Sequence, residues 1–320
     1  MSVDVDGLVA EARAGRARAV ARLISLVEDE SPHLRAVAAA LSPHVGRARV
    51  LGLTGPPGVG KSTSTSMLIS AFRARDLRVG VLAIDPSSPF SGGALLGDRI
   101  RLHDHTTDPA VFIRSMATRG HLGGLATATP QALRVLDAAG FDVVLVETVG
   151  VGQSEVDIVS LADTTVVLLA PGMGDGIQAA KAGILEVADV FVVNKADRDG
   201  ADQTVRDLRH MISLGRRETG PSWRQPIVRT VATTSQGADD LVSALDAHHD
   251  WLVAHGDLAR RRATRARREV EAIAVRELRA RLSGVGGGET LDRLATRVAA
   301  GELDPFTAAD ELIGEHRYQR

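Results

Sequence analysis

Short apolar runs separated by longer amphipathic stretches dominate the chain between residues 49 and 231. Seven of these runs are rich in Val, Leu and Ile with little polar alternation, as is typical of parallel strands buried on both faces. Strands that alternate with helices predict an α/β fold with a doubly wound, mostly parallel sheet, whose ligands bind at the carboxyl ends of the strands. The predicted strands are 49–53, 78–84, 111–114, 143–146, 164–170, 190–193 and 227–231.

Helical patterns flank this region on both sides. Before it, apolar residues recur at helical spacing, Asp4 or Asp6 can cap the first helix, and Ser31-Pro32 can start a second. After it, the pattern is helical and basic, with an apolar stripe, and a glycine-rich break precedes two shorter helices. We expect three parts: an N-terminal helical extension (1–45), an α/β domain (46–250) and a C-terminal helical dimerisation arm (251–320).

Charge and composition exclude several classes of protein. The 320 residues carry 38 basic and 40 acidic side chains, a net charge of −2, which argues against a nucleic-acid binder. No apolar run reaches the roughly 20 residues that span a bilayer, so we expect no membrane partner. Cysteine is absent, which excludes disulfides and cysteine nucleophiles. The N-terminus also lacks the layout of a signal peptide, so we expect a cytoplasmic protein.

Residues 55–62, G-P-P-G-V-G-K-S, fit the phosphate-binding pattern G-x-x-x-x-G-K-[ST] at every fixed position. The segment follows a predicted strand and opens a predicted helix at 62–73, which is the context that the motif requires. Backbone N–H groups and the helix N-terminus can then surround phosphates. Lys61 should reach the β- and γ-phosphates, and Ser62 should ligate Mg²⁺. The predicted phosphate site comprises Gly55, Pro56, Pro57, Gly58, Val59, Gly60, Lys61, Ser62 and Thr63.

A second motif, Asn194-Lys195-Ala196-Asp197, follows the predicted strand 190–193 and matches the N-K-x-D guanine motif of GTPases. The Asp197 carboxylate can accept hydrogen bonds from N1–H and the exocyclic amine of guanine, whereas adenine would leave it unpaired. The loop after 227–230 should add backbone contacts to the base. It reads Val231-Ala232-Thr233 where GTPases carry Ser-Ala-x, which is a departure from their pattern.

Carboxylates at the ends of two other predicted strands indicate a metal site. Asp85 follows one strand and Glu147 ends another, and a polar loop runs from Asp85 to Asp98. Such a loop can close over Mg²⁺ when a γ-phosphate is present. Residues 147–150, E-T-V-G, stand where common GTPases carry D-x-x-G, so the Gly150 N–H can sense the γ-phosphate. Gln153 can orient the attacking water.

Only three of the 38 basic residues are lysines, Lys61, Lys181 and Lys195. Two of them lie inside the phosphate and base motifs. Because arginine serves as the ordinary cation of this chain, a retained lysine indicates a place where the compact ammonium matters. We therefore include Lys181 among the predicted catalytic residues, together with Lys61, Asp98, Glu147 and Gln153.

Five segments together resemble the MeaB/ArgK family of P-loop GTPases, the bacterial relatives of the human cobalamin protein MMAA. They are GPPGVGKST (55–63), AIDPSSPFSGGALLGDRIR (83–101), ETVGVGQSE (147–155), PGMGDGIQAAKAGI (171–184) and NKAD (194–197). The resemblance implies a homodimeric GTPase that chaperones adenosylcobalamin-dependent methylmalonyl-CoA mutase, or a related acyl-CoA mutase. Carried over by position, it makes Ser62, Asp85, Asp98 and Glu147 the Mg²⁺ set. Segment 171–184, with Asp175 and Lys181, becomes a switch through which the partner stimulates hydrolysis of GTP to GDP.

Two other functions fit part of the pattern. One is a GTPase that inserts nickel as a metallochaperone, although its metal relay usually needs Cys and His. The close pairs His103/His105 and His248/His249 are more simply explained as surface residues. The other is an ArgK-type ATPase or kinase linked to basic amino-acid transport, against which the guanine motif argues.

Overall fold

All seven predicted strands form in the computed structural model, which describes residues 3–85, 102–117, 128–148, 158–172, 187–215, 222–282 and 287–317. Within these residues the strands make one parallel sheet in the order β3-β2-β4-β1-β5-β6-β7, which confirms the α/β fold. The strands are β1 (Arg49–Thr54), β2 (Val79–Asp85), β3 (Val111–Ala117), β4 (Val143–Thr148), β5 (Thr164–Leu169), β6 (Val190–Asn194) and β7 (Ile227–Thr230).

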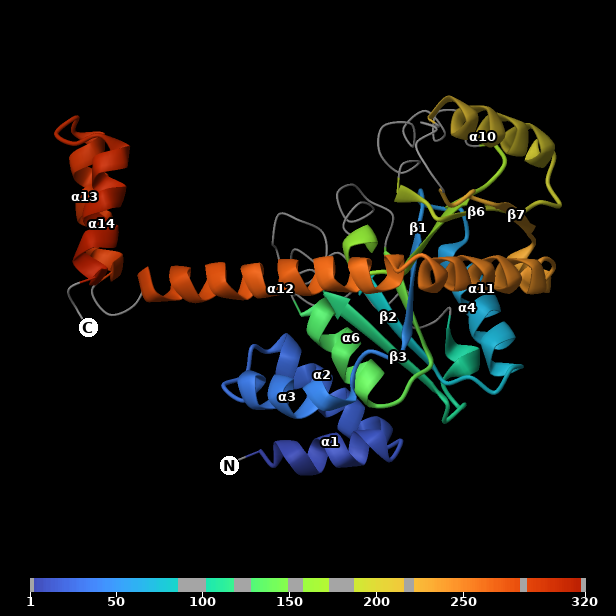
Figure 1. Ribbon diagram of the computed structural model, residues 1–320, viewed down its shortest axis with the longest axis horizontal. Helices are drawn as coiled ribbons and strands as arrows, with labels where there is room; N and C mark the ends of the chain where they lie inside the picture. The colour runs from blue at the N-terminus through green and yellow to red at the C-terminus, as the bar shows by residue number, and fades with distance from the viewer. Residues whose placement is uncertain are drawn as a thin grey trace. The chain divides into compact units, whose positions relative to one another are not determined.

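Helices precede, connect and follow these strands, as Figure 1 shows along the chain. The α-helices are α1 (Val5–Arg13), α2 (Ala17–Glu28), α3 (Leu34–Leu41), α4 (Lys61–Arg73), α6 (Thr129–Ala138), α10 (Ala201–Gly215), α11 (Ala238–Ala254), α12 (Asp257–Leu282), α13 (Gly287–Ala299) and α14 (Pro305–Arg317). Four short 3₁₀ turns among the described residues are Ser42–His44, His103–His105, Ile158–Ser160 and Ala232–Thr234.

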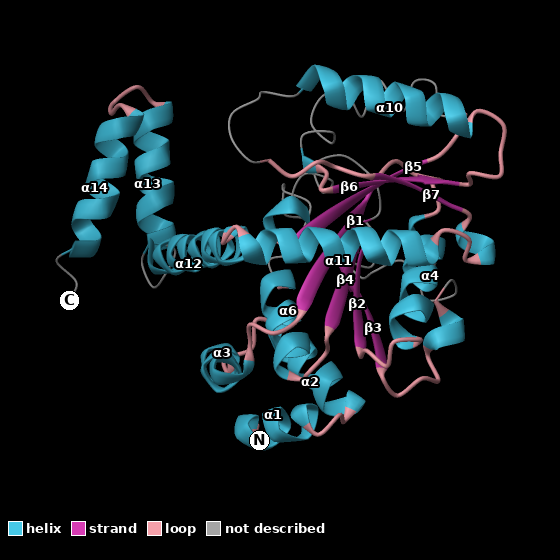
Figure 2. Ribbon diagram, turned by 45° about the vertical axis from the view of Figure 1, so that its right-hand side comes forward, coloured by secondary structure: helices cyan, strands magenta, loops and turns pink. Residues whose placement is uncertain are grey.

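Side chains alternate between the two faces of the sheet, and each face has its own core. Leu53 of β1 and Val166 of β5 are paired in register and lie in the core beneath α4 and α11. Val50 of β1 and Val146 of β4 lie in the opposite core, which also contains residues of α1–α3 and α6. Figure 2 shows α4 and α6 on opposite sides of the strands. A residue's position along its strand therefore determines whether it faces α4.

The three N-terminal helices pack beside α6 and share its core, so they extend the α/β domain rather than standing apart from it. Asp4 caps α1 by accepting a hydrogen bond from the Gly7 backbone N–H at 2.9 Å, one of the two predicted caps. The helical stretch is broken after α1, where Gly15 adopts φ +82°. Glycine takes up this left-handed conformation without the steric cost that a side chain brings.

The chain divides into two compact units, residues 1–261 and 262–320. In the second unit α13 and α14 pack against each other around the buried Leu294 and Ala308, and an Arg297–Glu311 ion pair of 2.9 Å links them. Several apolar side chains of α12 are exposed, among them Val270 and Leu278. Across the described ranges, no helix is long and apolar enough to cross a membrane.

Candidate nucleotide site

The phosphate loop runs between the end of β1 and the start of α4, at the carboxyl edge of the sheet. Its first glycine, Gly55, adopts φ +142°, and a Cβ there would lie only 2.2 Å from the carbonyl oxygen of Leu168 on β5. Only glycine fits so close an approach of two backbones. The buried Lys61 ammonium folds back over the loop and donates to the Gly55 and Pro56 carbonyl oxygens at 2.7 and 3.1 Å. The carbonyl groups at the start of the phosphate loop thus hold the Lys61 ammonium against the loop.

Glu147 is brought to the phosphate loop by the register of the sheet. It pairs with Leu53, which faces α4, and the whole residue is only 5% exposed. Glu147 Oε1 accepts a hydrogen bond from Ser62 Oγ at 2.6 Å, and Glu147 Oε2 accepts one from Thr65 Oγ1 at 2.8 Å. Two of the predicted metal ligands, Ser62 and Glu147, are therefore in direct contact. Hydroxyl and carboxylate oxygens are donors that suit Mg²⁺.

Asn194 joins the base motif to the phosphate loop. Its amide nitrogen donates to the Val59 carbonyl oxygen at 2.8 Å. Its Oδ1 accepts from Thr230 Oγ1 and from the Ala232 backbone N–H, both at 3.1 Å. A single side chain therefore ties together β6, the phosphate loop and the segment after β7. The predicted segment Val231-Ala232-Thr233 lies beside the motif despite its departure from the usual residues.

Lys195 and Asp197 follow on the same turn. Lys195 has φ +57°, a left-handed conformation that is uncommon for a residue with a side chain. Its ammonium donates to the Gly58 carbonyl oxygen at 2.7 Å. Asp197 is exposed, so its carboxylate is accessible to a ligand. Two of the three lysines thus contact carbonyls of the same phosphate loop.

Several predicted site residues cannot be placed. Asp98, Gly150, Gln153 and Lys181 lie outside the described residues. Asp85 ends β2 at the carboxyl edge, but its side chain also lies outside the description. In the part of the chain that is described, no three His, Asp or Glu side chains gather as a metal site. The roles assigned to these five residues stay predictions.

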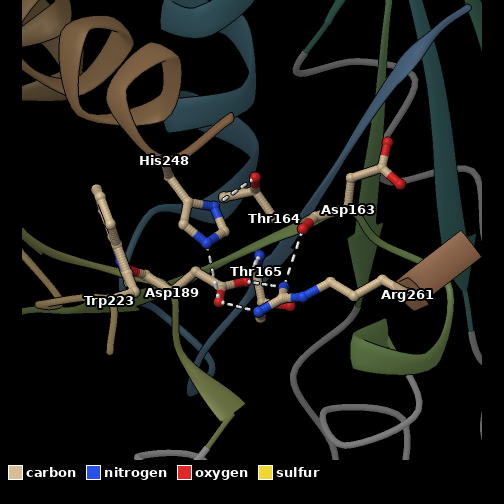
Figure 3. Close-up of polar contacts among 7 residues, drawn as sticks. All are labelled: Asp163, Thr164, Thr165, Asp189, Trp223, His248 and Arg261. Atoms are coloured by element: carbon tan, nitrogen blue, oxygen red, sulfur yellow. Dashed lines mark hydrogen bonds and ion pairs between the residues drawn. The ribbon is translucent and has the colours of Figure 1, made fainter. Parts of the chain in front are cut away.

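A second polar cluster lies at the opposite, amino edge of the sheet (Figure 3). Asp189, just before β6, accepts two hydrogen bonds of 2.8 Å from Arg261, one to each carboxylate oxygen. It also accepts one from the Thr165 backbone N–H at 2.8 Å. His248 lies 3.3 Å from Asp189 through Nε2 and 2.8 Å from Thr164 Oγ1 through Nδ1. The expectation that His248 is a surface residue is wrong, because its side chain is fully buried.

This cluster keeps Asp189 ionised in the protein interior. Burial raises the pKa of its carboxyl, but the contacts with His248 and Arg261 outweigh burial and hold the pKa below its usual range. Arg261 also donates to the Asp163 carbonyl oxygen at 2.9 Å. The contacts join β5, β6, α11 and the first turns of α12. We interpret the cluster as structural, since it lies at the edge of the sheet away from the phosphate loop.

The structure adds two side chains to the site that the sequence motifs did not single out. Thr65 lies three residues after Ser62 on α4, so both point to one helix face. Thr230 ends β7 opposite Asn194 in the strand register. Helical spacing from a known ligand could have indicated Thr65. Thr230 carries no comparable signal, because its partner is 36 residues away.

Known proteins resemble this chain over most of its length. Residues 20–286 match the family model described as "Methylmalonyl Co-A mutase-associated GTPase MeaB". A Pyrococcus abyssi protein named "Putative GTPase" is 48% identical over 315 residues, covering 97% of this chain and 96% of its own. "GTPase ArgK" of Escherichia coli is 37% identical over 253 residues, covering 77% and 76%. The solved "LAO/AO transport system kinase" superposes with a TM-score of 0.71 at 26% identity, over 99% of both chains.

Proposed function

Because this chain belongs to the MeaB family of GTPases, we propose that it couples GTP binding and hydrolysis to the chaperoning of a cobalamin-dependent acyl-CoA mutase. Methylmalonyl-CoA mutase is the client that the family description favours. The observation that carries the nucleotide part is Asn194, which holds the guanine motif against the phosphate loop through Val59. Base recognition and phosphate binding thereby share one rigid site.

Binding of GTP exchanges contacts within the protein for contacts to the ligand. Lys61 can turn from the Gly55 and Pro56 carbonyls to the β- and γ-phosphates, because its ammonium already lies at the rim of the loop. The exposed Asp197 accepts the two N–H donors of guanine. Adenine lacks these donors in that geometry, so ATP would leave the carboxylate unpaired.

The oxygen donors Ser62 and Glu147, together with Asp85 and Asp98, would hold the magnesium ion. When bound, Mg²⁺ neutralises charge on the β- and γ-phosphates. Glu147 accepts a hydrogen bond from the Ser62 hydroxyl, which leaves the lone pairs of Ser62 Oγ available to a ligand. Gly150 senses the γ-phosphate and Gln153 orients the attacking water. In hydrolysis the oxygen of this water bonds to the γ-phosphorus while the bond from the γ-phosphorus to the bridging oxygen breaks, which gives GDP and inorganic phosphate.

A partner would complete this site. We assign the stimulation of hydrolysis by the partner to segment 171–184, where Lys181 adds a charge-stabilising contact when the client binds. The C-terminal region 251–320 serves as the arm of a homodimer, supported by the exposed Val270 and Leu278 of α12. Apolar side chains exposed together on one helix are typical of a surface that another chain covers.

The two alternatives receive less support. A nickel relay usually needs cysteine as well as histidine, and the sequence contains no cysteine. A kinase linked to basic amino-acid transport would use ATP, whereas the base motif is built for guanine.

The proposal is tested with purified protein, the nucleotide and the mutase. We expect GTP to bind at least a hundredfold more tightly than ATP, and phosphate release to be slow alone and faster with methylmalonyl-CoA mutase. A pull-down from native lysate with a non-hydrolysable GTP analogue, compared with GDP, identifies the client. Equal binding of ATP would overturn the base assignment, and a different captured mutase would correct the client alone.

A further inference from the structure

Thr65 belongs to neither nucleotide motif, yet its hydroxyl contacts the carboxylate at the centre of the phosphate site. The side chain is fully buried on α4, one turn after Ser62. Its Oγ1 lies 2.8 Å from Glu147 Oε2, while Ser62 Oγ lies 2.6 Å from Glu147 Oε1. Each carboxylate oxygen of Glu147 therefore accepts a hydrogen bond from a hydroxyl of the same helix.

Two contacts constrain a carboxylate in a way that one does not. A second hydrogen bond, to the other carboxylate oxygen, restrains rotation of the Glu147 carboxylate about its last bond more than the bond from Ser62 does by itself. The second contact, from Thr65, fixes the plane of the carboxylate relative to α4. Since Ser62 and Thr65 are three residues apart, the helix itself sets the distance between the two donors.

The direction of the Thr65 proton matters because a hydroxyl has only one. Thr65 Oγ1 is also 3.1 Å from the Lys61 carbonyl oxygen, the usual acceptor for a threonine that bonds back to its own helix. The carboxylate oxygen is the closer acceptor, at 2.8 Å against 3.1 Å for the carbonyl oxygen. Bonds to charged groups are the stronger ones. The proton of Thr65 is therefore directed to Glu147.

We propose that Thr65 is a positioning residue of the magnesium site, which sets Mg²⁺ affinity by holding Glu147 in the orientation that receives the Ser62 proton. The inference rests on the magnesium site proposed above. It assigns Thr65 no contact with the metal or the nucleotide. Groups that orient metal ligands in this way typically contribute ten- to hundredfold to metal affinity.

The test compares Thr65→Val, which keeps the shape and removes the hydroxyl, with Thr65→Ser, which keeps the hydroxyl. Mg²⁺ is titrated into each protein bound to a fluorescent N-methylanthraniloyl-GDP, and release of the nucleotide is followed. We expect Thr65→Val to raise the Mg²⁺ concentration for half-maximal retention about tenfold, and Thr65→Ser to stay within about twofold of wild type. Affinity for the nucleotide in EDTA should be unchanged in all of them.

Ser64→Ala is the matched control. Ser64 is a fully buried hydroxyl on the same helix, and its Oγ has no hydrogen-bond partner in the described part of the chain. We expect its Mg²⁺ dependence to equal that of wild type. Thermal unfolding without ligand verifies that each variant is folded, and a Thr65→Val protein that does not fold leaves Thr65→Ala to be titrated instead.

The possible outcomes distinguish failure of this inference from failure of the proposed magnesium site on which it rests. If wild type retains the nucleotide equally with and without Mg²⁺, the proposed magnesium site fails. If wild type depends on Mg²⁺ but Thr65→Val matches it, the site stands and the role of Thr65 is refuted. If Thr65→Ser is as impaired as Thr65→Val, the impairment does not follow the hydroxyl group, which also refutes the inference.

Discussion

Removal of the Arg261 guanidinium is expected to destabilise the larger unit by about 2 to 3 kcal/mol. Arg261→Met keeps an unbranched apolar stem but deletes both hydrogen bonds to Asp189 and the one to the Asp163 carbonyl. Hydrogen bonds to a charged group each contribute about 1.5 to 3 kcal/mol. Because the Arg261 side chain is 37% exposed, water replaces part of this loss, and we place the cost at the lower end.

Urea unfolding at pH 7 measures this cost. With an m-value of about 3 kcal/mol/M, the midpoint should fall by about 0.7 to 1 M. Arg260→Met is the control, since Arg260 lies on the same helix, its side chain is 72% exposed and it pairs with Asp257. We expect it to change stability by less than about 0.5 kcal/mol.

The coupling to Asp189 is measured in a double-mutant cycle with Asp189→Asn. In that background Arg261→Met should cost at least about 1 kcal/mol less, because the buried charge that it compensates has been removed. An unchanged cost in the two backgrounds would refute our account of the cluster. So would an Arg261→Met protein as stable as wild type.

The same cluster predicts how stability depends on pH. The folded-state pKa of Asp189 lies below its ordinary value of 3.8, since His248 and Arg261 favour the ionised form. The stability that Asp189 contributes is therefore fully present above about pH 4 and is lost as pH falls through the folded-state pKa. Below pH 4, wild type should lose stability more steeply than Asp189→Asn. Parallel curves would contradict the assignment.

Three further predictions concern the nucleotide site. Asp197→Asn should weaken GTP binding at least tenfold and favour xanthosine triphosphate, measured by competition for a fluorescent nucleotide; unchanged GTP preference would refute the base assignment. Gly60→Ala should weaken GTP binding at least tenfold in the same assay, because its Cβ would lie 2.5 Å from Asn194 Nδ2 at φ +94°; wild-type affinity would show that Asn194 is dispensable. Lys181→Ala should leave basal phosphate release intact and abolish stimulation by the mutase, and full stimulation would return Lys181 to a surface role.

The strands could be predicted from the sequence because their signal is local. Runs of Val, Leu and Ile gave all seven, with ends that differ from the structure by a few residues. The largest difference is β3, predicted to end at Arg114 but continuing to Ala117 in register with β2. Arg114 interrupts the apolar run because it pairs with Glu28 of α2. That partner is 86 residues distant, so no local pattern indicates it.

The same contrast between local and distant signals applies to the polar sites of the protein. The motifs of the nucleotide site are contiguous and lie at strand ends, so the sequence predicted the phosphate loop and Glu147 at one edge of the sheet and placed Asn194 after another strand. The contact of Asn194 with the phosphate loop emerged only from the structure. The buried amino-edge cluster could not be predicted, since His248 and Asp189 are ordinary polar residues until the fold brings them together. A histidine beside a second histidine on a helix gives no sign of which of the two is buried.

The central position of β1 has a consequence for how such a protein can change. β4 lies on one side of β1 and contributes Glu147, while β6 lies beyond β5 on the other side and contributes Asn194. In the proposed function, the group that serves the metal ion and the group that supports the base motif thus reach one loop from opposite flanks, through different strands. Substitutions that alter the preferred base need not disturb the cleavage step. Under that proposal, selection can adjust the preferred base and the rate of hydrolysis through residues on different strands.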